Sequence, residues 1–453
     1  MVAVRRICVI RVLLGSEMVR VNNRFLLTHL NILPLFRVNF IHLLNFANYL
    51  VIPMNLILAD DQFRDQLLPF AFTRPVADIR VGILTIRHKW EMLLKIPQGT
   101  SGSLTSFYLS GRFPLSEGKD CLLINGSLLP DANTLKAIQA LKPNQQLVWE
   151  GRLIAAMLDR DKLVGKDHVL PFDELESIPY VGTPDLLNNV WEIFTKNDAA
   201  LRADFQLLTK GRRSEVISGS NQTIQPDQIF IEAGAKVECA ILNASTGPIY
   251  IGKDAEVMEG CMVRGPFALG EHAVLKMGAK VYGATTIGPG SKVGGEVSNS
   301  VIFANSNKAH DGFLGNSVLG EWCNLGADTN NSNLKNNYSE VKIWNYPAAD
   351  YKGTGLQFCG LFMGDHSKCG INTMFNTGTV VGVFANVFGA GFPEKFIPSF
   401  SWGGTGESEV FLLDKALALA EKVMARRNIV MTEADRNILS HLFMIQLKPA
   451  SDI

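Results

Sequence analysis

The chain lacks the charge imbalance that is typical of nucleic-acid binding proteins. Its 453 residues include 43 basic and 43 acidic side chains, and no long basic run breaks this balance. Nucleic-acid binding domains usually gather Lys and Arg on one face, so we expect no nucleic-acid partner. A hydrophobic content of 47% also excludes a disordered chain, and the length predicts two or three domains.

Cysteine is scarce and follows no ligand pattern. The seven cysteines are scattered, odd in number and include no C-x-x-C pair. A disulfide framework or a zinc site would need paired or closely spaced cysteines. The sequence therefore favours reduced thiols in a cytoplasmic protein.

Residues 1–53 contain no lysine and one acid, Glu17, beside six arginines. The uncharged run 38–59 is long enough to suggest a membrane-spanning segment, but asparagines, a histidine and a proline interrupt it. A signal peptide would need a compact apolar core and a small-residue cleavage site, and neither is found. We expect residues 1–53 to be a leader outside the domains; the alternatives are an anchor or a targeting peptide. No membrane partner is expected.

Glycine is almost confined to one segment. Of 40 glycines, 28 lie between Gly234 and Gly406, and none follows Gly406. A six-residue repeat runs through the same segment. Such a period fits neither an amphipathic helix nor a simple strand, but it fits a parallel β-helix with an inward aliphatic residue on each side. We therefore expect a β-helix over residues 220–406. The repeat positions are Ile231, Val237, Ile251, Val257, Val263, Leu269, Leu275, Val281, Ile287, Val293, Phe313, Leu319, Leu325, Met363, Cys369, Phe375, Val381 and Val387.

These 18 positions predict roughly six three-sided coils. Before them, residues 54–213 alternate strand-like and helix-like stretches, which predicts an α/β domain with a mainly parallel sheet. The expected strands are 54–58, 106–109 and 121–124, and the expected helices are 82–94, 133–141 and 184–208. After them, residues 408–427 and 432–446 predict two amphipathic helices that cover the last coil, the second with a Thr432-x-x-Asp435 capping pattern.

Two stretches break the six-residue register, residues 294–312 and 327–362. Loops on a rigid scaffold often carry binding and catalytic groups. The first stretch contains His310, whose imidazole could act as a general base near neutral pH or could simply be a polar loop residue. His366 is a competing candidate, and we expect His272 to lie on the surface.

The stretch that runs from Asn305 through Ser306-Asn307-Lys308-Ala309-His310 to Asn324-Leu325-Gly326-Ala327 resembles a known family. It is similar to the acetyltransferase half of the bifunctional glucosamine-1-phosphate acetyltransferase/N-acetylglucosamine-1-phosphate uridylyltransferases. The resemblance implies an N-terminal nucleotidyltransferase domain, a left-handed β-helix that works as a homotrimer, and acetyl-CoA as co-substrate. It implies that His310 is the catalytic base with Lys308 beside it, and that Asn324, the backbone of Ala327 and Asn333 contact the acetyl group or CoA.

The chain departs from the family pattern at the sugar-phosphate contacts. Phe313 and Leu334 stand where the family has tyrosines, and the insertion 330–358 is longer and rich in Asn. Lys335 and Tyr338 are candidate replacements; a solvated loop is the alternative. The acceptor could therefore differ from glucosamine 1-phosphate.

The N-terminal domain has no glycine where its relatives carry a phosphate-binding loop, because its first strand leads into residues 59–64. This resembles a divergent branch of sugar nucleotidyltransferases. Arg64, Arg74 and Arg80 could bind phosphates through bidentate hydrogen bonds, or could instead pair with Asp60, Asp61 or Asp78. Asp131 is the nearest carboxylate for Mg²⁺, and it is a weak candidate.

The sequence thus predicts an enzyme of amino-sugar-phosphate activation that binds a sugar phosphate, a nucleotide and CoA. Its β-helix would be a CoA-dependent N-acetyltransferase, and its N-terminal domain a nucleotidyltransferase that makes a UDP- or other NDP-sugar. The alternative is a non-catalytic sugar-nucleotide binding protein or trimeric scaffold. A metal-dependent β-helix enzyme would need histidines at an interface, and the repeat offers only His272, His310 and His366.

Overall fold

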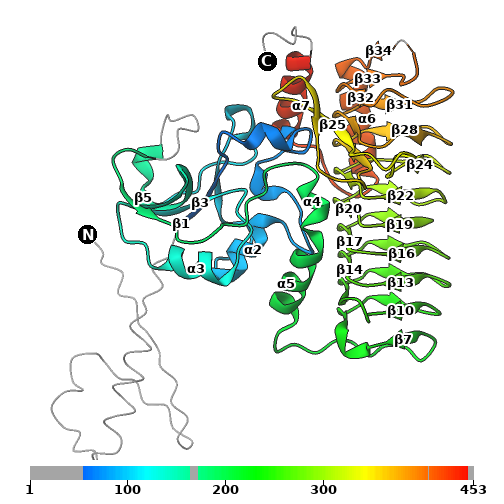
Figure 1. Ribbon diagram of the computed structural model, residues 1–453, viewed down its shortest axis with the longest axis horizontal. Helices are drawn as coiled ribbons and strands as arrows, with labels where there is room; N and C mark the ends of the chain where they lie inside the picture. The colour runs from blue at the N-terminus through cyan, green and yellow to red at the C-terminus, as the bar shows by residue number, and fades with distance from the viewer. Residues whose placement is uncertain (1–54, 164–171, 407, 447–453) are drawn as a thin grey trace, which may run out of the picture. The chain divides into compact units, whose positions relative to one another are not determined.

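The computed structural model describes residues 55–163, 172–406 and 408–446. They form an α/β domain, a parallel β-helix and two C-terminal helices, in that chain order (Figure 1). The predicted leader, residues 1–53, lies outside the described residues. Within the described ranges, each helix is too short or too polar to cross a lipid bilayer.

The α/β domain is built on a six-stranded sheet of order β2-β1-β3-β5-β4-β6. β1 is parallel to β2 and β3, and β4 is parallel to β6, but β5 is antiparallel to both β3 and β4. The expected mainly parallel sheet is therefore mixed, because β4 and β5 form a hairpin that the sequence analysis missed. The strands are β1 (Asn55–Ala59), β2 (Gly102–Leu104), β3 (Asp120–Asn125), β4 (Gln145–Trp149), β5 (Arg152–Asp159) and β6 (Glu176–Pro179).

Helices of this domain differ from the expected ranges in their bounds, and one expected helix is divided in two. The stretch 82–94 yields α2 (Ile86–Leu93), and 133–141 yields α3 (Ala132–Gln139). The stretch 184–208 contains two helices, α4 (Glu192–Thr195) and α5 (Asn197–Thr209). The expected strand 106–109 is wrong: Phe107–Leu109 is a 3-10 turn, and the sheet strand is β2, just before it.

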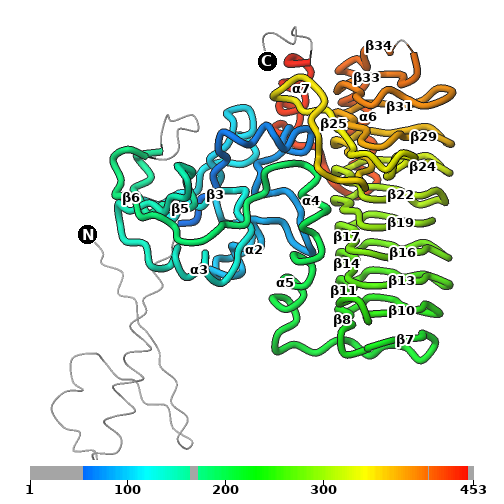
Figure 2. Tube along the Cα trace, viewed as in Figure 1, coloured from blue at the N-terminus to red at the C-terminus, as the bar shows by residue number. Residues whose placement is uncertain are grey.

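The β-helix has three faces, and the face toward the α/β domain is a nine-stranded parallel sheet, here called the domain-facing sheet (Figure 2). Its strands are β8 (Ile229–Ile231), β11 (Ile249–Ile251), β14 (Phe267–Leu269), β17 (Thr285–Ile287), β20 (Val301–Ile302), β23 (Val318–Leu319), β27 (Leu361–Met363), β30 (Thr379–Val381) and β32 (Phe396–Ile397).

The other two faces follow in turn along each coil. The second face holds β9 (Lys236–Val237), β12 (Glu256–Val257), β15 (Val274–Leu275), β18 (Lys292–Val293), β21 (Asn307–Lys308), β28 (Lys368–Cys369), β31 (Asn386–Val387) and β33 (Ser401–Trp402). The third face holds β7 (Gln222–Ile224), β10 (Ile241–Asn243), β13 (Met262–Arg264), β16 (Lys280–Tyr282), β19 (Glu296–Ser298), β22 (Phe313–Gly315), β24 (Asn330–Asn331) and β29 (Met374–Phe375).

The uninterrupted part of the repeat is confirmed by burial. The eight positions from Ile251 to Val293 are at most 2% exposed, and they line one continuous core. The hydrophobic repeat thus aligns aliphatic side chains in stacked ladders, such as Val257 on Leu275. Burying each of these side chains contributes about 1.5–3 kcal/mol of transfer free energy.

The first predicted interruption, 294–312, is instead a shortened coil. Val297 pairs with Val281 on one side and with Leu314 on the other. The number of residues from one inward position to the equivalent position on the next coil therefore falls below eighteen. Leu314 is 1% exposed, whereas Phe313 is half-buried, so the inward position predicted at Phe313 is off by one. Because this stretch continues the ladder, the domain-facing sheet has nine strands, and the estimate of six coils is too low.

The second interruption, 327–362, contains an antiparallel hairpin of β25 (Lys342–Asn345) and β26 (Asp350–Gly353). Val341 and Ile343 are buried in the same hydrophobic core as residues of the α/β domain. Figure 1 shows β25 beside the upper coils, on the side of the α/β domain. The insertion therefore packs between the β-helix and the α/β domain and does not form a solvated loop throughout.

The α/β domain and the β-helix also meet along α5. Asn197 donates from Nδ2 to the Ala284 carbonyl at 3.0 Å and accepts at Oδ1 from the Gly82 N–H at 2.7 Å. Leu201 and Phe205 pack against outward side chains of the domain-facing sheet, including Phe230. This contact fixes the α/β domain against one face of the β-helix and leaves the other two faces uncovered by it.

The C-terminal helices are α6 (Leu413–Ala425) and α7 (Glu433–Gln446). Thr432 caps α7 as the sequence predicts: its hydroxyl accepts from the Asp435 N–H at 3.1 Å, and the Asp435 carboxylate accepts from the Thr432 N–H at 2.9 Å. The edge of the last coil is paired by β34 (Glu409–Val410), which is antiparallel to β33. The helices themselves pack on a row of corner aromatics that includes Phe384 and Phe400.

Candidate functional site

His310 lies at a corner of the β-helix, between β21 on the second face and β22 on the third. Its imidazole is exposed. The corners of successive coils stack here: the Asp328 N–H donates to the Asp311 carbonyl at 3.1 Å, and the Asn372 N–H donates to the Ala327 carbonyl at 2.8 Å. The structure therefore brings Lys308, His310, Asn324 and Ala327 together on neighbouring coils of one chain.

Lys308 occupies an inward position of the ladder, where other coils carry an aliphatic residue. It pairs with Val293, is 2% exposed, and donates from Nζ to the His310 carbonyl at 2.7 Å. Burial lowers the pKa of Lys308 to about 8, although Asp311 and Asp328 act in the opposite direction. Lys308 therefore supports the backbone of the His310 corner from inside the β-helix.

Asn324 and Ala327 lie on the coil that follows His310. Asn324 accepts at Oδ1 from Asn307 Nδ2 at 2.9 Å, and its side chain is half-buried. Among the described residues, none accepts a hydrogen bond from the Ala327 N–H. A free N–H beside a candidate base can stabilise the oxyanion that forms during acyl transfer.

Asn333, Lys335 and Tyr338 lie at a different corner, after β24 on the third face. Asn333 donates from Nδ2 to Asn316 Oδ1 at 2.8 Å, and Lys335 Nζ donates to the Glu340 carbonyl. Tyr338 is 65% exposed. In one chain, the structure does not bring these three predicted contacts to the His310 corner.

The competing histidines have other environments. His366 is buried, with its ring stacked 4.5 Å from Phe384 and 6.1 Å from Trp322. Burial lowers the pKa of His366 well below its usual range. His272 is exposed beside Asp254, as expected of a surface residue. Of the three histidines in the repeat, His310 and His272 are exposed and His366 is buried.

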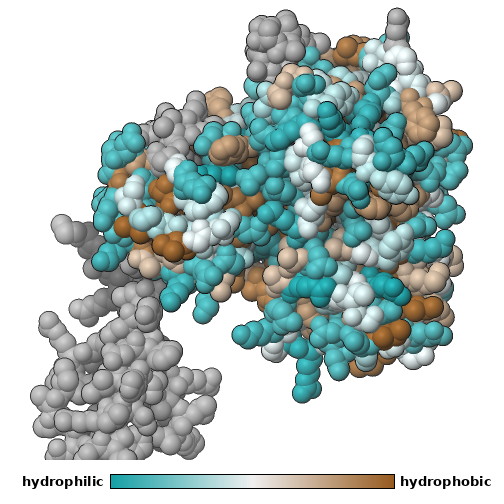
Figure 3. All heavy atoms as spheres, in the orientation of Figure 1, coloured by the Kyte–Doolittle hydropathy of each residue, from teal (hydrophilic) through white to brown (hydrophobic). Residues whose placement is uncertain are grey.

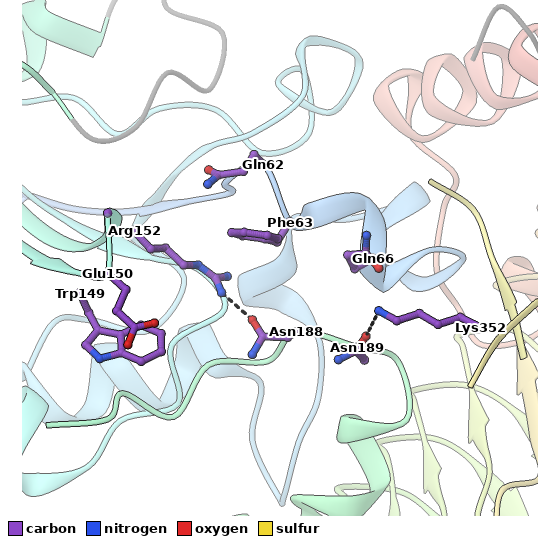
Figure 4. Close-up of a pocket in the computed structure, with 10 residues that line it drawn as sticks. Gln62, Phe63, Gln66, Trp149, Glu150, Arg152, Asn188, Asn189 and Lys352 are labelled. Atoms are coloured by element: carbon purple, nitrogen blue, oxygen red, sulfur yellow. Dashed lines mark hydrogen bonds between the residues drawn. The ribbon is translucent and has the colours of Figure 1, made fainter. Parts of the chain in front are cut away.

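A second candidate site lies in the α/β domain, at the ends of its strands (Figure 4). A cavity of about 430 Å³ opens where β1 leaves the sheet and β5 enters it. Crevices outside the carboxyl ends of strands are the usual ligand sites of open α/β sheets. The lining residues are Gln62, Phe63, Gln66, Trp149, Glu150, Gly151, Arg152, Asn188, Asn189 and Lys352.

Arg152 organises the floor of this cavity. Its Nε lies 2.5 Å from Asp61 Oδ2, its Nη1 donates to Asn188 Oδ1 at 2.5 Å, and its guanidinium lies 4.5 Å from the Phe63 ring centroid. Asp61 Oδ2 also accepts from Asn125 Nδ2 at 2.9 Å. The cavity wall is therefore a network of ion pairs and hydrogen bonds that holds Phe63 and Asn188 in place.

The three arginines predicted to bind phosphate have protein partners. Arg64 pairs with Asp60 at 3.3 Å, which is the alternative that the sequence left open, and it also donates to Tyr108 Oη. Arg74 is buried and pairs with Asp365 and Glu321 of the β-helix. Burial lowers the pKa of Arg74, but these two carboxylates raise it by more.

Arg80 donates from Nη1 to the Ile83 carbonyl, and burial lowers its pKa to about 10. None of the three arginines is among the residues that line the cavity of the α/β domain. Their guanidinium groups instead satisfy carboxylates and carbonyls of the protein.

The carboxylates of the α/β domain fit a Mg²⁺ ion poorly. Asp131 is the N-cap of α3, where its carboxylate accepts from the N–H groups of Asn133 and Thr134. Asp60 accepts from the Val76 N–H and the Thr105 hydroxyl, and Asp61 is bound by Arg152. Among the described residues that line the cavity, Glu150 is the one carboxylate, whereas Mg²⁺ sites commonly use one or two with substrate phosphates.

The sequence analysis missed the cavity residues, above all Trp149, Arg152 and Lys352. The Glu150-Gly151 pair was an available signal, because both residues have positive φ, 48° and 77°, in a two-residue hairpin turn. Recognising that hairpin would have placed Trp149 and Arg152 at the ends of adjacent strands. Lys352 could not be found in this way, because it reaches the cavity from the β-helix insertion.

The comparisons with known proteins agree with this organisation. Residues 56–213, about a third of the chain, match the family model described as sugar nucleotidyl transferase. A bifunctional sugar-1-phosphate nucleotidylyltransferase/acetyltransferase of Sulfurisphaera tokodaii is 30% identical over 148 residues, 31% of this chain and 35% of the relative. A bifunctional GlmU protein of Methanocaldococcus jannaschii is 33% identical over 87 residues, 19% of this chain and 21% of the relative.

Among solved structures, an Arabidopsis UDP-N-acetylglucosamine acyltransferase is 16% identical, with a TM-score of 0.21 over 48% of this chain and 78% of its own. The Bacillus cereus N-acyltransferase AntD, solved with dTDP and coenzyme A, is 12% identical, with a TM-score of 0.21 over 46% of this chain and 90% of its own. At these TM-scores the two likenesses indicate nothing about the activity of this chain.

The sequence matches to the two bifunctional relatives span about a third of the length of one and a fifth of the other. Residues 56–213 therefore match the sugar nucleotidyl transferase family, and parts of the chain are similar to a bifunctional sugar-1-phosphate nucleotidylyltransferase/acetyltransferase and to a bifunctional GlmU protein.

Proposed function

We propose that the β-helix transfers an acetyl group from acetyl-CoA to the amine of an amino-sugar phosphate, with His310 as general base. The observation that carries this proposal is the exposed imidazole of His310 on a corner that stacks, through the Asp328–Asp311 backbone hydrogen bond, on the corner of Ala327. The Sulfurisphaera tokodaii relative supports it, because its name includes acetyltransferase activity.

The proposed reaction needs one base and one oxyanion donor. The amine nitrogen attacks the thioester carbonyl, and the His310 imidazole accepts the proton that this nitrogen loses. The Ala327 N–H donates to the carbonyl oxygen as it becomes negative; the carbon–sulfur bond then breaks, and the CoA thiolate leaves and takes up the proton held by the His310 imidazolium. Lys308 holds the carbonyl of His310 from within the coil and so positions the imidazole.

We propose further that the cavity of the α/β domain binds a nucleotide or a sugar nucleotide. Aromatic rings at Phe63 and Trp149 can stack on a base or a sugar, and the amides of Asn188 and Asn189 can hydrogen-bond to hydroxyls. The family match of residues 56–213 supports this ligand class. In the catalytic form of the proposal, the domain transfers a nucleotidyl group to the sugar phosphate.

A non-catalytic binding role for the α/β domain is the second candidate. It is favoured because Asp60 and Asp61 already bind protein groups, the Val76 N–H and Arg152. Glu150 is therefore the carboxylate that lines the cavity. Nucleotidyl transfer assisted by Mg²⁺ would normally draw on such carboxylates. We therefore route no step of the proposal through a metal ion.

We propose that the working form is a homotrimer, so that a neighbouring chain completes the His310 corner. Apolar side chains on the third face are 40% to 44% exposed at Ile241, Met262 and Tyr282, and Figure 3 shows apolar surface near β10 and β13. Ile241 and Met262 are neighbours on paired strands, and adjacent exposed apolar side chains are typical of an interface. Light scattering should report three times the chain mass of 49.8 kDa; a monomer would contradict the trimer.

An acceptor screen tests the acetyltransferase proposal. Purified protein is mixed with acetyl-CoA and a panel of amino-sugar phosphates that begins with glucosamine 1-phosphate, and released thiol is measured. We expect thiol release that depends on one acceptor of this class. Release that is the same with and without every acceptor would contradict the proposal.

A further inference from the structure

Lys352 is the one residue of the β-helix insertion that lines the cavity of the α/β domain. It lies on β26, donates from Nζ to Asn189 Oδ1 at 3.2 Å, and sits 5.7 Å from the centroid of the Trp191 ring. Figure 4 shows Lys352 entering from the side opposite Trp149 and Glu150. A cation from one half of the chain thus reaches the candidate ligand site of the other half.

The hairpin that carries Lys352 is fixed to the α/β domain by three independent contacts. Asn345 donates from Nδ2 to Gln66 Oε1 at 2.9 Å, and the ring of Tyr346 meets that of Phe72 edge-on at 5.2 Å. Ile343 is 1% exposed within the core that both parts share. The backbone of β26 is therefore held in place, and a ligand need order only the end of the Lys352 side chain.

The other nearby cations are already neutralised. Arg152, the second cation that lines the cavity, pairs with the buried carboxylate of Asp61 at 2.5 Å. Arg64 pairs with Asp60, and Arg74 with Asp365, both outside the cavity lining. Lys352 forms no ion pair with the described carboxylates, and its Nζ donates to a neutral amide, so Lys352 is the lining cation that can offer its charge to a ligand.

The opposite wall of the cavity carries the opposite charge to Lys352. Glu150 is exposed on the β4–β5 turn beside Trp149 and can accept hydrogen bonds from hydroxyl groups. An anionic group would be repelled at Glu150 and attracted at Lys352. A ligand with a phosphate at one end and a hydroxyl-bearing ring at the other therefore fits in one orientation.

We propose that Lys352 binds the phosphate of a phosphorylated sugar or nucleotide in this cavity, in place of a glycine-rich loop of the α/β domain. The ligand phosphate lies at Lys352, and its ring lies toward Trp149 and Glu150. The β-helix insertion thereby completes the site of the other domain. This inference rests on the proposed ligand class of the α/β domain, and it identifies Lys352 as the residue that binds the phosphate.

Calorimetric titration of the full chain tests the inference with four probes: UTP, UDP-N-acetylglucosamine, glucosamine 1-phosphate and uridine, which has no phosphate. The variants are Lys352→Met, Lys352→Arg and the control Lys342→Met. Lys342 is exposed on the partner strand of the same hairpin and does not line the cavity. The probe that binds identifies whether the phosphate belongs to a nucleotide or to a sugar phosphate.

We expect Lys352→Met to weaken binding of the phosphorylated probe about ten- to a hundredfold, because a hydrogen bond to a charged group is lost. Lys352→Arg should keep most of the affinity, Lys342→Met should match the wild type, and any binding of uridine should be unchanged in all variants. Suppose that the wild type binds a phosphorylated probe. If Lys352→Met then binds it as tightly as the wild type, or if Lys342→Met weakens binding as much as Lys352→Met does, the role of Lys352 is overturned while the ligand class stands. If the wild type binds none of the four, both are overturned.

Discussion

At the scale of single residues, Lys308 shows how the inside of the β-helix can carry a charge. The repeat reserves its position for an aliphatic side chain, yet Lys308 lies there at 2% exposure with a pKa lowered to about 8 by burial. Its hydrogen bond to the His310 carbonyl explains its presence, because that bond fixes the corner. The cost of the buried charge makes the stability of the fold depend on pH.

Lys308 should raise the stability of the protein as pH increases from about 8 to 10.5. In this window the unfolded chain, with its pKa of 10.5, binds more protons than the folded one, so the free energy of unfolding rises with pH. The slope from one group is at most about 1.4 kcal/mol per pH unit. Urea unfolding across the window should show a smaller slope in Lys308→Met.

Lys368 contributes in the same direction, since burial also lowers its pKa to about 8. In Lys308→Met, the slope of the free energy of unfolding against pH should therefore be smaller than in the wild type but not zero. Lys292→Met, on the exposed side of the neighbouring strand β18, is the control and should keep the full slope. Equal slopes in Lys308→Met and the wild type would show that Lys308 is not buried as a charge.

Arg74 gives a second prediction at this scale. It is 6% exposed and pairs with Asp365, which is 3% exposed, across the contact between the two parts. Removing one member leaves the other as an unpaired buried charge, so Arg74→Met should lower the free energy of unfolding by about 3–5 kcal/mol. Arg436→Met breaks an exposed pair with Glu421 and should cost at most about 1 kcal/mol. A matching small loss in both variants would contradict the buried pair.

Residue identities could be predicted from the sequence where the repeat is regular and not where a coil is shortened. Val257 and Leu275 follow the six-residue period, and both are buried as expected. The change of spacing after Val293 moved the inward position from Phe313 to Leu314, and it put Lys308 inside. For Arg74, the sequence analysis predicted a phosphate ligand. It could not identify the true partners, Glu321 and Asp365, because they are distant in the sequence.

At the scale of elements, the capping pattern before α7 was readable because all its partners lie within four residues. Thr432 and Asp435 bond to each other's backbone N–H groups as the pattern predicts. Strand 106–109 was wrong, and the β4–β5 hairpin was missed, because short apolar runs do not distinguish a strand from a turn.

Thr432→Ala should therefore destabilise the chain by about 1 kcal/mol, since it removes the acceptor for the Asp435 N–H. Chemical denaturation provides the measurement. Asn437→Ala lies on an exposed position of the same helix and tests for a general effect of substitution in α7; it should be neutral or slightly stabilising. Thr432→Ala with wild-type stability would argue that the cap contributes nothing.

At the scale of the whole molecule, the two candidate sites lie on different sides of the β-helix. The cavity of the α/β domain lies on the side of the domain-facing sheet, and its wall includes Lys352 from the insertion. His310 lies at the corner between the other two faces. The order of domains and the β-helix could be predicted from glycine and the hydrophobic period, but the contact between the parts could not. It depends on pairs such as Asn345 with Gln66 that are 279 positions apart.

The central claim is that His310 is the base of an acetyl transfer on the β-helix, and kinetics of His310→Ala test it most directly. Acetyl-CoA consumption is followed as released thiol, with the acceptor that the screen identifies. His272→Ala removes another exposed corner histidine of the same β-helix and serves as the matched control. We predict that His310→Ala lowers kcat/KM by about 10²–10⁴-fold while the control matches the wild type and both variants melt normally. Full activity in His310→Ala would contradict the claim.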